Sequence, residues 1–411
     1  MKDNNKNKTN VPNLRFPGFE EEWERKRLGE VADKVMYGMN AAAIPFDGIN
    51  KYLRITDIDD ISRRFKANPL TSPSGEIEEK YQLKVGDIVL TRTGASVGKS
   101  YLYNPNDGKL LFAGFLIKFS IINANPYFVF SQTLKSNYNK WVQKMSMRSG
   151  QPGINAEEYK DLELAFPAIS EQDKISTFLS LIDERIQCQN KIIEELKSFK
   201  SAVSKRIFSQ ELRFKDENGE ECPDWEEKKL WEIAEKRIKK NIDNKIINVF
   251  TNSAINGIVN QRDFFEKDIA NQNNLNGYYI VENNDFVYNP RISSTAPVGP
   301  ISRNHLGSGV MSPLYSVFRL KLGNIDFIEC IFNTNVWHKH MENIANYGAR
   351  ADRMSFAIGD FYEMPIPFPS LSEQTKIANF LSSIDEKIET EKQIIEQYKK
   401  QKAYLLQNIF I

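Results

Sequence analysis

Three short stretches of this chain carry side chains that could do chemistry, and each departs from the motif it approaches. Residues 93–100 read Thr-Gly-Ala-Ser-Val-Gly-Lys-Ser, close to a phosphate-binding P-loop, but only three residues separate Gly94 from Gly98 where the motif needs four. A P-loop must also open a helix, because the helix N-terminus binds the phosphates. Residues 101–103, Tyr-Leu-Tyr, instead predict a strand. We therefore expect no nucleotide-binding site here.

The other two stretches contain metal-binding residue types. Residues 223–228, Pro-Asp-Trp-Glu-Glu-Lys, hold the letters of a PD-ExK nuclease, but two carboxylates and a lysine cannot converge on one metal ion within so short a stretch. His338 and His340 are the only close histidine pair, and no further ligand stands at the spacing of a zinc site. We interpret the first as a charged turn and the second as an exposed helix. No nucleophile-elbow or metalloprotease motif is present either, so the sequence predicts no catalytic residue, no metal site and no cofactor in this chain.

Loops that combine arginine with small or polar residues are stronger candidates for binding. Arginine makes paired hydrogen bonds to guanine, and asparagine or glutamine makes them to adenine, so such loops are typical of DNA readout. An ordinary surface loop is the alternative. The DNA-binding candidates in the first half of the chain are Arg92, Thr93, Ser96, Lys99, Arg148, Gln151 and Asn155. Those in the second half are Arg291, Ser293, Ser294, Arg350 and Arg353.

The elements that must position these loops follow from an internal repeat. The segment FPAISEQDKISTFLSLIDERI, from Phe166, matches FPSLSEQTKIANFLSSIDEKI, from Phe368, at an offset of 202 residues. The same offset relates Trp23-Glu24 to Trp225-Glu226, while Leu14-Arg15-Phe16 answers Leu212-Arg213-Phe214 with a four-residue insertion in the second copy. The middles of the two copies differ strongly. A shared scaffold therefore carries two different variable parts.

The repeated tails predict two long helices. Apolar residues recur every three or four positions, proline precedes each run, and Ser170 and Ser372 are good N-cap residues. About 38 residues at 1.5 Å each give a helix of roughly 57 Å, which is too long for one small domain to cover. We expect the two helices to form an antiparallel coiled coil; packing of each stripe on its own domain is the alternative. The stripe residues are Ile175, Phe178, Leu179, Ile182 and Ile186, then Ile377, Phe380, Leu381, Ile384 and Ile388.

The variable parts read as mixed α and β. Asp87–Thr91 and the stretch 285–289 predict short strands, each followed by an arginine and a small-residue loop. The fold class expected is α+β: two mixed α/β domains joined by two long antiparallel coiled-coil helices with a pseudo-two-fold internal repeat. The expected boundaries are a disordered arm at 1–13, domains at 14–167 and 210–367, a central helix at 168–209 and a C-terminal helix at 368–411.

Composition sets limits on the class of protein. The 411 residues carry 55 Lys and Arg against 54 Asp and Glu, so the net charge of +1 gives no support to nucleic-acid binding. Three distant cysteines indicate reduced thiols in a bacterial cytoplasm, not a disulfide framework. The start of the chain lacks the apolar core of a signal peptide, and we expect no membrane segment.

The doubled tail PxxSEQxKIxxFLSxIDExI, at residues 167–186 and 369–388, resembles the conserved regions of the specificity (S) subunits of type I restriction-modification systems. The openings LRFPGF with Trp23 and Leu28, and Gly-Asp-Ile-Val-Leu-Thr-Arg-Thr-Gly at 86–94, are similar to that family too. The resemblance covers nearly the whole chain.

The resemblance implies two target-recognition domains, each reading one half of a bipartite, asymmetric DNA target. It also implies that the helices dock two methyltransferase (M) subunits and that the assembly recruits restriction-translocase (R) subunits. S-adenosylmethionine, ATP and Mg²⁺ would belong to those partners. The alternatives are a specificity subunit that serves only a methyltransferase complex, a coiled-coil scaffold without DNA readout, and an enzyme that combines recognition and catalysis in one chain.

Overall fold

The computed structural model describes residues 10–147, 151–264, 275–346 and 352–411. They form two compact units, and each unit combines one globular domain with parts of both long helices. The first unit is Met1–Lys191 with Lys392–Ile411, and the second is Ile192–Glu391. The predicted mixture of helices and sheets is confirmed, but the compact units divide each long helix rather than ending where it begins.

The domain of the first unit is built on a four-stranded antiparallel sheet in the order β2-β9-β6-β7. Its strands are β2 (Ala32–Tyr37), β6 (Asp87–Thr91), β7 (Ser100–Leu102) and β9 (Leu116–Ile121). The predicted strand Asp87–Thr91 is therefore confirmed, and the residues after Lys99 form a strand as expected. The other strands are β1 (Glu24–Arg27), β3 (Ala43–Pro45), β4 (Lys51–Leu53), β5 (Thr71–Pro73), β8 (Leu110–Phe112) and β10 (Glu163–Phe166). The helices are α1 (Pro126–Gln132), α2 (Ser136–Ser146) and α3 (Ala156–Lys160), with one-turn 3₁₀ helices at Leu28–Glu30, Ile55–Asp57, Glu79–Tyr81 and Pro105–Asp107.

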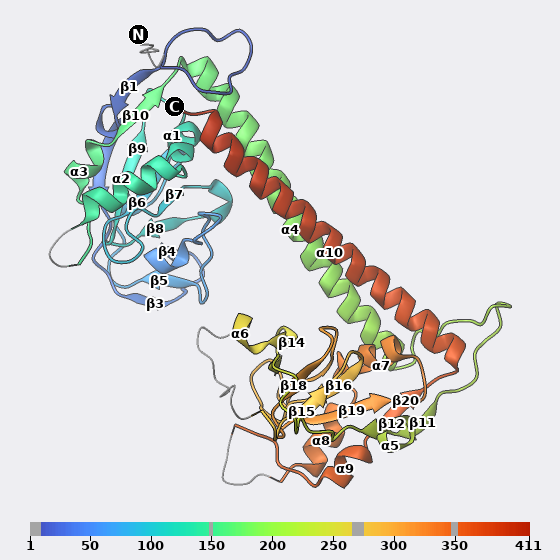
Figure 1. Ribbon diagram of the computed structural model, residues 1–411. Helices are drawn as coiled ribbons and strands as arrows, with labels where there is room; N and C mark the ends of the chain where they lie inside the picture. The colour runs from blue at the N-terminus through green and yellow to red at the C-terminus, as the bar shows by residue number, and fades with distance from the viewer. Residues whose placement is uncertain (1–9, 148–150, 265–274, 347–351) are drawn as a thin grey trace, which may run out of the picture. The chain divides into compact units, whose positions relative to one another are not determined.

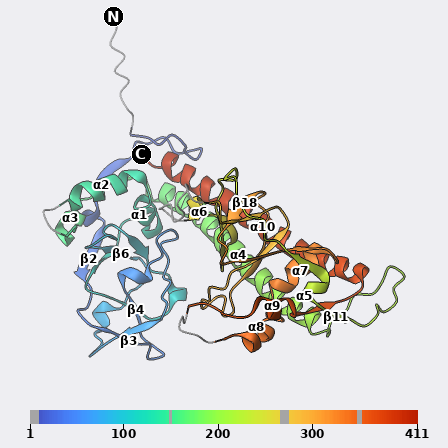
Figure 2. The ribbon, with the colours of Figure 1, turned by 60° about the horizontal axis from the view of Figure 1, so that its bottom comes forward.

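Strand β6 is buried on both faces. Ile88 and Leu90 lie in the core that also holds side chains of α1 and α2, whereas Val89 packs with Leu53 of β4 and Leu110 of β8. Alternate residues of a strand point to opposite faces, which explains why a strand covered on both sides has no polar position between Ile88 and Leu90. Figure 2 shows α1 and α2 on one side of β2 and β6 and the strands β3 and β4 on the other.

The domain of the second unit repeats this sheet in the order β12-β19-β16-β17. Its strands are β11 (Glu226–Lys229), β12 (Ala234–Lys236), β13 (Phe250–Ser253), β14 (Gly257–Asn260), β15 (Tyr279–Val281), β16 (Asp285–Tyr288), β17 (Ile301–Arg303), β18 (Gly309–Met311), β19 (Ser316–Leu320) and β20 (Pro365–Phe368). Its helices are α5 (Leu230–Ile233), α6 (Gln261–Phe264), α7 (Ile325–Phe332), α8 (His338–Ile344) and α9 (Ile358–Tyr362). The variable middles thus share one topology although their sequences differ.

The repeated tails form α4 (Ile169–Phe208), with 40 residues, and α10 (Leu371–Asn408), with 38 residues. The predicted N-caps are wrong, because Ser170 and Ser372 lie inside the first turn. The residue before α10, Ser370, accepts a hydrogen bond at its Oγ from the Glu373 N–H at 3.3 Å. Its counterpart before α4 is Ala168, whose carbonyl accepts from the Glu171 N–H. The cap therefore stands two residues earlier than the sequence suggested.

The two helices run antiparallel within each unit, as predicted (Figure 1). In the first unit Lys402 donates to Asp183 at 2.6 Å, and in the second Lys200 donates to Asp385 at 2.6 Å. The two ion pairs are sequence equivalents, because both members of one stand 202 residues from their counterparts in the other. The apolar stripe also meets the domain core: Ile175 and Leu179 belong to the same cluster as β6. Both packing arrangements considered from the sequence therefore occur in the first unit.

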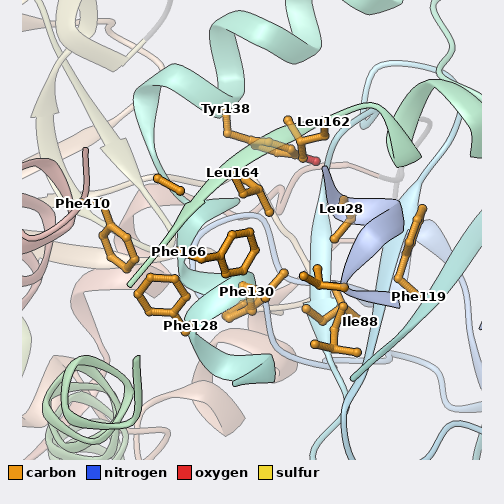
Figure 3. Packing of buried hydrophobic residues seen from close by; sticks show 14 of the residues in the cluster. Leu28, Ile88, Phe119, Phe128, Phe130, Tyr138, Leu162, Leu164, Phe166 and Phe410 are labelled. Atoms are coloured by element: carbon orange, nitrogen blue, oxygen red, sulfur yellow. The ribbon is translucent and has the colours of Figure 1, made fainter. Parts of the chain in front are cut away.

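Phe410, just after α10, completes the aromatic core of the first domain (Figure 3). Its ring centroid lies 5.1 Å from that of Phe128 and 6.2 Å from that of Trp23. It is 3% exposed. The domain of the first repeat is thus closed by the end of the second repeat's helix.

The second domain has the reciprocal arrangement. Phe208, at the end of α4, lies 6.0 Å from Phe327 and 6.3 Å from Trp225 between ring centroids. Trp225 and Phe327 stand where Trp23 and Phe128 stand in the first domain. This exchange accounts for the match between Ile207-Phe208 and Ile409-Phe410.

The glutamate of the repeated Ser-Glu-Gln motif explains the front of each repeat. Arg15 binds Glu171 through Nε and a terminal nitrogen, both at 2.8 Å, and Arg213 binds Glu373 in the same way at 2.8 and 2.9 Å. Both carboxylates are almost fully buried. A buried carboxylate is stable only when it is paired, and the two-bond arginine geometry is the strongest available.

The glutamine of the motif ties the helix start to the domain. Gln172 donates to the Pro167 carbonyl at 2.9 Å and accepts from the Asn125 N–H at 3.0 Å. Asn125 in turn caps α1 through hydrogen bonds from two backbone N–H groups. Gln374 makes the equivalent bonds in the second unit, to the Pro369 carbonyl and from the Asn324 N–H. The conserved letters therefore build a rigid junction between helix and domain.

Candidate nucleic-acid interface

The predicted binding loops leave one end of the central sheet. In the first unit, β2 and β6 both pair antiparallel with β9, so the ends of β2 and β6 lie beside its start. The Gly38 N–H donates to the Leu116 carbonyl, and the Arg92 N–H donates to the Phe115 carbonyl, both at 3.0 Å. The residues that follow β2 and β6 are therefore neighbours in space although more than 50 residues separate them.

The structure brings the two candidate loops of the first domain together. Thr93 and Gly153 form an antiparallel bridge. The Gly94 N–H donates to the Pro152 carbonyl at 3.0 Å, and the Ile154 N–H donates to the Arg92 carbonyl at 2.9 Å. The loop after β6 and the loop before α3 thus form one surface.

The second domain joins its loops in the same way. Arg291 and Arg353 form the bridge, flanked by hydrogen bonds from the Ile292 N–H to the Asp352 carbonyl at 3.0 Å and from the Met354 N–H to the Pro290 carbonyl at 2.8 Å. The same backbone arrangement therefore presents different side chains in the two domains.

This pairing corrects the residue equivalence expected from the sequence. By hydrogen-bond pattern Arg291 corresponds to Thr93, and Pro290 corresponds to Arg92. The two arginines occupy adjacent positions, and in extended chain adjacent side chains point to opposite sides. The order of strand, arginine and loop is shared, but the arginines are not interchangeable parts.

Arg92 is held by an aromatic ring. Its guanidinium carbon lies 4.9 Å from the centroid of the Tyr37 ring, at the end of β2. The Tyr37 hydroxyl accepts a hydrogen bond from the Ala156 N–H at 3.1 Å, so the same ring also contacts the start of α3. Stacking on an aromatic face leaves the edge of a guanidinium open to a bidentate acceptor. Tyr37 was not predicted, because nothing near it in sequence marks it as a partner of a residue 55 positions away.

Arg291 and Arg353 bring two positive charges to one bridge. Arg291 is exposed, and Arg353 is within 3.8 Å of a carboxylate oxygen of its neighbour Asp352. Like charges directly opposite each other destabilise paired strands. An arrangement that costs free energy in the isolated protein suits a site where an anion neutralises it.

Lys99 must be removed from the candidate set. Its side chain is 8% exposed, its Nζ donates to the Ile58 carbonyl at 3.0 Å, and it pairs with the Asp60 carboxylate. The lysine that resembled a P-loop residue therefore fastens the loop to the residues after β4. It cannot reach a ligand without breaking both interactions.

The remaining candidates have mixed placements. Asn155 is exposed and caps α3, accepting from the Glu158 N–H at 2.9 Å. Ser293 Oγ lies 3.1 Å from Thr295 Oγ1 and shapes a turn with Ser294 at its tip. Gln151 is exposed beside Gly94, and Ser96 is half-buried. Arg148 and Arg350 lie outside the described residues.

Two buried tyrosines support the first of these loops. The Tyr159 hydroxyl donates to the Thr91 carbonyl at 2.7 Å, and the Tyr138 hydroxyl donates to the Gly98 carbonyl at 2.8 Å. Burial raises the pKa of both phenols, so they remain neutral hydrogen-bond donors. A Cβ at Gly98, where φ is +85°, would meet Val142 at 2.6 Å, which explains the glycine.

Metal and membrane sites were also considered. Across the described ranges, no group of three or more His, Cys, Asp or Glu side chains is arranged to hold a metal ion. His338 and His340 lie on α8, the helix expected for them. In the part of the chain that the structure covers, no helix combines the length and apolar character needed to cross a bilayer.

Comparison with known proteins identifies the family. The type I restriction modification DNA specificity domain matches this chain twice, over residues 20–198 and 223–400. The chain belongs to this family. The two matches coincide with the two repeats, and each takes in one globular domain and most of one long helix.

Relatives match along nearly the whole chain. Two specificity subunits of Methanocaldococcus jannaschii are similar: the putative MjaX subunit, 23% identical over 94% of this chain and 92% of the relative, and the MjaVIII subunit, 24% identical over 96% and 92%. The crystal structure of a type I S subunit from M. genitalium aligns with a TM-score of 0.56 and 14% identity over 98% of this chain and 99% of that one. That likeness concerns the fold. The predicted resemblance to specificity subunits is confirmed.

Proposed function

We propose that each globular domain of this specificity subunit reads one half of a bipartite, asymmetric DNA target. The two long helices bind methyltransferase subunits, and the assembly recruits restriction-translocase subunits where these are present. The chain itself contributes recognition, whereas S-adenosylmethionine, ATP and Mg²⁺ are bound by those partners.

One observation carries this proposal: the same pair of loops is joined at the same end of the same sheet in both domains, with different side chains. In the first domain the surface carries Arg92, Thr93 and Gln151, and in the second it carries Arg291 and Arg353. A shared backbone with exchanged side chains is what two readers of two different sequences require. Arginine and glutamine are also the residues that form paired hydrogen bonds to base edges.

The near-neutral charge fits a division of labour. Phosphate contacts supply most of the sequence-independent affinity for DNA and require a basic surface, whereas base contacts supply specificity. With a net charge of +1 this chain is a poor source of the first and can still provide the second. The bulk of the phosphate contacts would come from the methyltransferase subunits.

The test is methylation sequencing of a strain with the intact gene, without it, and with single substitutions. Loss of a bipartite methylated sequence on deletion would support the proposal. Arg92→Ala should relax one half of that sequence and leave the other half unchanged. Arg27→Ala is the matched control, because Arg27 lies on β1 and pairs with Asp161 away from the loops.

The alternatives predict other outcomes. A scaffold without DNA readout predicts no sequence-selective retention of DNA by the complex with methyltransferase subunits. A chain that combines recognition and catalysis predicts methylation by the purified chain alone. A subunit that serves only a methyltransferase complex predicts normal methylation and no restriction of unmodified phage DNA.

A further inference from the structure

The second domain carries a basic segment that has no counterpart in the first. Residues 236–245, which we call the basic segment, read Lys-Arg-Ile-Lys-Lys-Asn-Ile-Asp-Asn-Lys, with five basic residues and one acidic residue. The stretch that follows the equivalent strand β2, residues 38–46, contains no charged residue. The two domains therefore differ in charge at one structurally matched place.

The backbone places the basic segment at the end of the sheet that carries the candidate loops. The Arg237 N–H donates to the Val317 carbonyl at 2.8 Å, which continues β12 along β19. Val317 in turn pairs with Val287 of β16, which leads into Arg291. The segment and the Arg291–Arg353 bridge thus leave the sheet in the same direction, as residues 38–46 and Arg92 do in the first domain.

The segment is held in a defined conformation. Lys240 bridges Tyr279 next to β15, and the Ile280 N–H donates to the Lys239 carbonyl at 2.8 Å. The buried side chain of Asn241 closes the following loop, donating to the Ile246 carbonyl at 2.8 Å and accepting from its N–H at 3.2 Å. These bonds present the preceding lysines from a fixed backbone.

Three of its cations carry no compensating charge. Arg237 pairs with Glu282 at 2.9 Å, and Lys245 pairs with Asp243 at 2.7 Å. Lys236, Lys239 and Lys240 are exposed and form no ion pair with any residue in the described ranges. A fixed row of unpaired cations beside two further arginines makes a local positive field in a protein that is otherwise balanced.

We infer that the basic segment contacts the DNA backbone beside the half-target read by the second domain. This inference rests on the proposed function. Residues 236–240 in extended conformation cover about 13 Å, and one DNA strand offers a phosphate every ~3.4 Å along its axis. Each of the three lysines can therefore meet its own phosphate. The contact adds affinity without sequence information, and it makes the second domain the more firmly anchored of the two.

The test is the salt dependence of DNA binding by the complex of this chain with its methyltransferase subunits. The variant Lys236→Gln/Lys239→Gln/Lys240→Gln removes three charges and keeps side-chain length. The slope of log Kobs against log salt should fall in magnitude by up to ~2.7, from about 0.9 for each lost phosphate contact. The preference for the target over a scrambled duplex should stay unchanged.

The matched control is Lys26→Gln/Lys80→Gln/Lys84→Gln. These lysines are exposed and each is paired with a glutamate of the first unit. The control removes the same total charge, so it should leave the slope within ~0.5 of wild type if the local contacts matter, as opposed to net charge. An equal fall in both triple variants overturns the inference.

Two other outcomes also decide it. An unchanged slope in the basic-segment variant, with target preference intact, overturns this inference and leaves the proposed function standing. Loss of methyltransferase subunits from the variant complex, with a normal slope in the fraction that assembles, assigns the segment to a protein partner and overturns it too. Absence of target preference in the wild-type complex would instead refute the proposed function.

Discussion

The guanidinium carbon of Arg92 lies 4.9 Å from the centroid of the Tyr37 ring, and the Tyr37 hydroxyl is bonded to the N–H that starts α3. One side chain from the end of β2 thus contacts both loops of the first candidate interface. The ring restricts the rotamers of Arg92, and the hydroxyl fixes the loop that pairs with Thr93. Tyr37 is therefore a positioning residue in the proposed interface.

Substitution of Tyr37 should weaken recognition of one half-target. A cation–π contact at a partly exposed site contributes about 0.5–1 kcal/mol, so we expect Tyr37→Leu to reduce affinity for the target by roughly two- to five-fold. Tyr37→Phe keeps the ring and should retain most of the affinity. The measurement is binding to duplexes altered in either half of the target. An equal loss of discrimination in both halves would argue against a local role.

Arg291 and Arg353 should contribute to binding and not to stability. A bidentate contact to a base provides about 1–3 kcal/mol of discrimination, so Arg291→Ala and Arg353→Ala should each reduce selection for the second half-target by roughly 5- to 150-fold. Thermal unfolding should be unchanged or slightly improved, because the variants relieve repulsion across the bridge. Arg291→Lys keeps the charge but loses the planar fork, and it should restore affinity more than selectivity. A lowered melting temperature with intact selectivity would make the arginines structural.

The exchange of helix ends predicts which domain each substitution destabilises. Truncation of a buried phenylalanine costs about 3–5 kcal/mol, so Phe410→Ala should destabilise the first unit although it lies at the end of the second repeat. Phe208→Ala should destabilise the second unit. Hydrogen exchange of peptides from β6 and β16 distinguishes the two, and Phe199→Ala is the control because Phe199 is 53% exposed. Faster exchange in the domain of the same repeat would contradict the exchange of ends.

The ion pair between Arg213 and Glu373 should respond asymmetrically to substitution. Arg213→Leu leaves a carboxylate that is 0% exposed without its partner, and breaking a buried pair in this way costs about 3–5 kcal/mol. Glu373→Gln should cost less, because the Arg213 side chain is 19% exposed and keeps its bond to the Pro223 carbonyl. Denaturant unfolding of the two single variants and of the double variant measures the coupling. Equal costs for the single variants would show that burial of the carboxylate is not the dominant effect.

The scaffold was predictable from sequence because its signals are local or repeated. The offset of 202 residues predicted two equivalent domains, and the spacing of Ile175, Leu179 and Ile182 predicted a helix with one apolar face. The run Asp87–Thr91 predicted a buried strand for the same reason. Each of these inferences needs only residues within one turn, one strand or one alignment.

The parts that sequence missed depend on contacts between distant residues. Lys99 was taken for a ligand-binding lysine because its carboxylate partner, Asp60, lies 39 residues away. Tyr37 carried no signal, and the short helices α3 and α9 are too brief to show a period. The misplaced caps at Ser170 and Ser372 arose because serine is favoured at the cap and also tolerated in the first turn. The recognition loops were located by order along the chain, but their side chains could be matched only through backbone hydrogen bonds.

Cys330 provides a test of the packing of α7 that does not depend on DNA. Burial raises the pKa of its thiol to about 12 from an ordinary value of 9.0. In the unfolded chain the thiol ionises from pH 9 upward, whereas the folded state keeps its proton until about pH 12. The unfolded state therefore binds fewer protons in this window, and the stability of the second unit should fall as pH rises above 9, by at most ~1.4 kcal/mol per pH unit. Cys330→Val should remove that part of the slope between pH 9 and 10.

Alkylation follows the same logic. At pH 8 the folded Cys330 thiol should react at least 100-fold more slowly with iodoacetamide than the exposed Cys188, because only the thiolate is nucleophilic and burial blocks access. Mass spectrometry of the two peptides over time gives both rates, and a denatured sample gives the unprotected rate for each. Similar rates for the two cysteines in the folded protein would mean that α7 opens readily, and the junction that Gln374 and Asn324 make with its start would then be too weak to hold the second domain rigidly on α10.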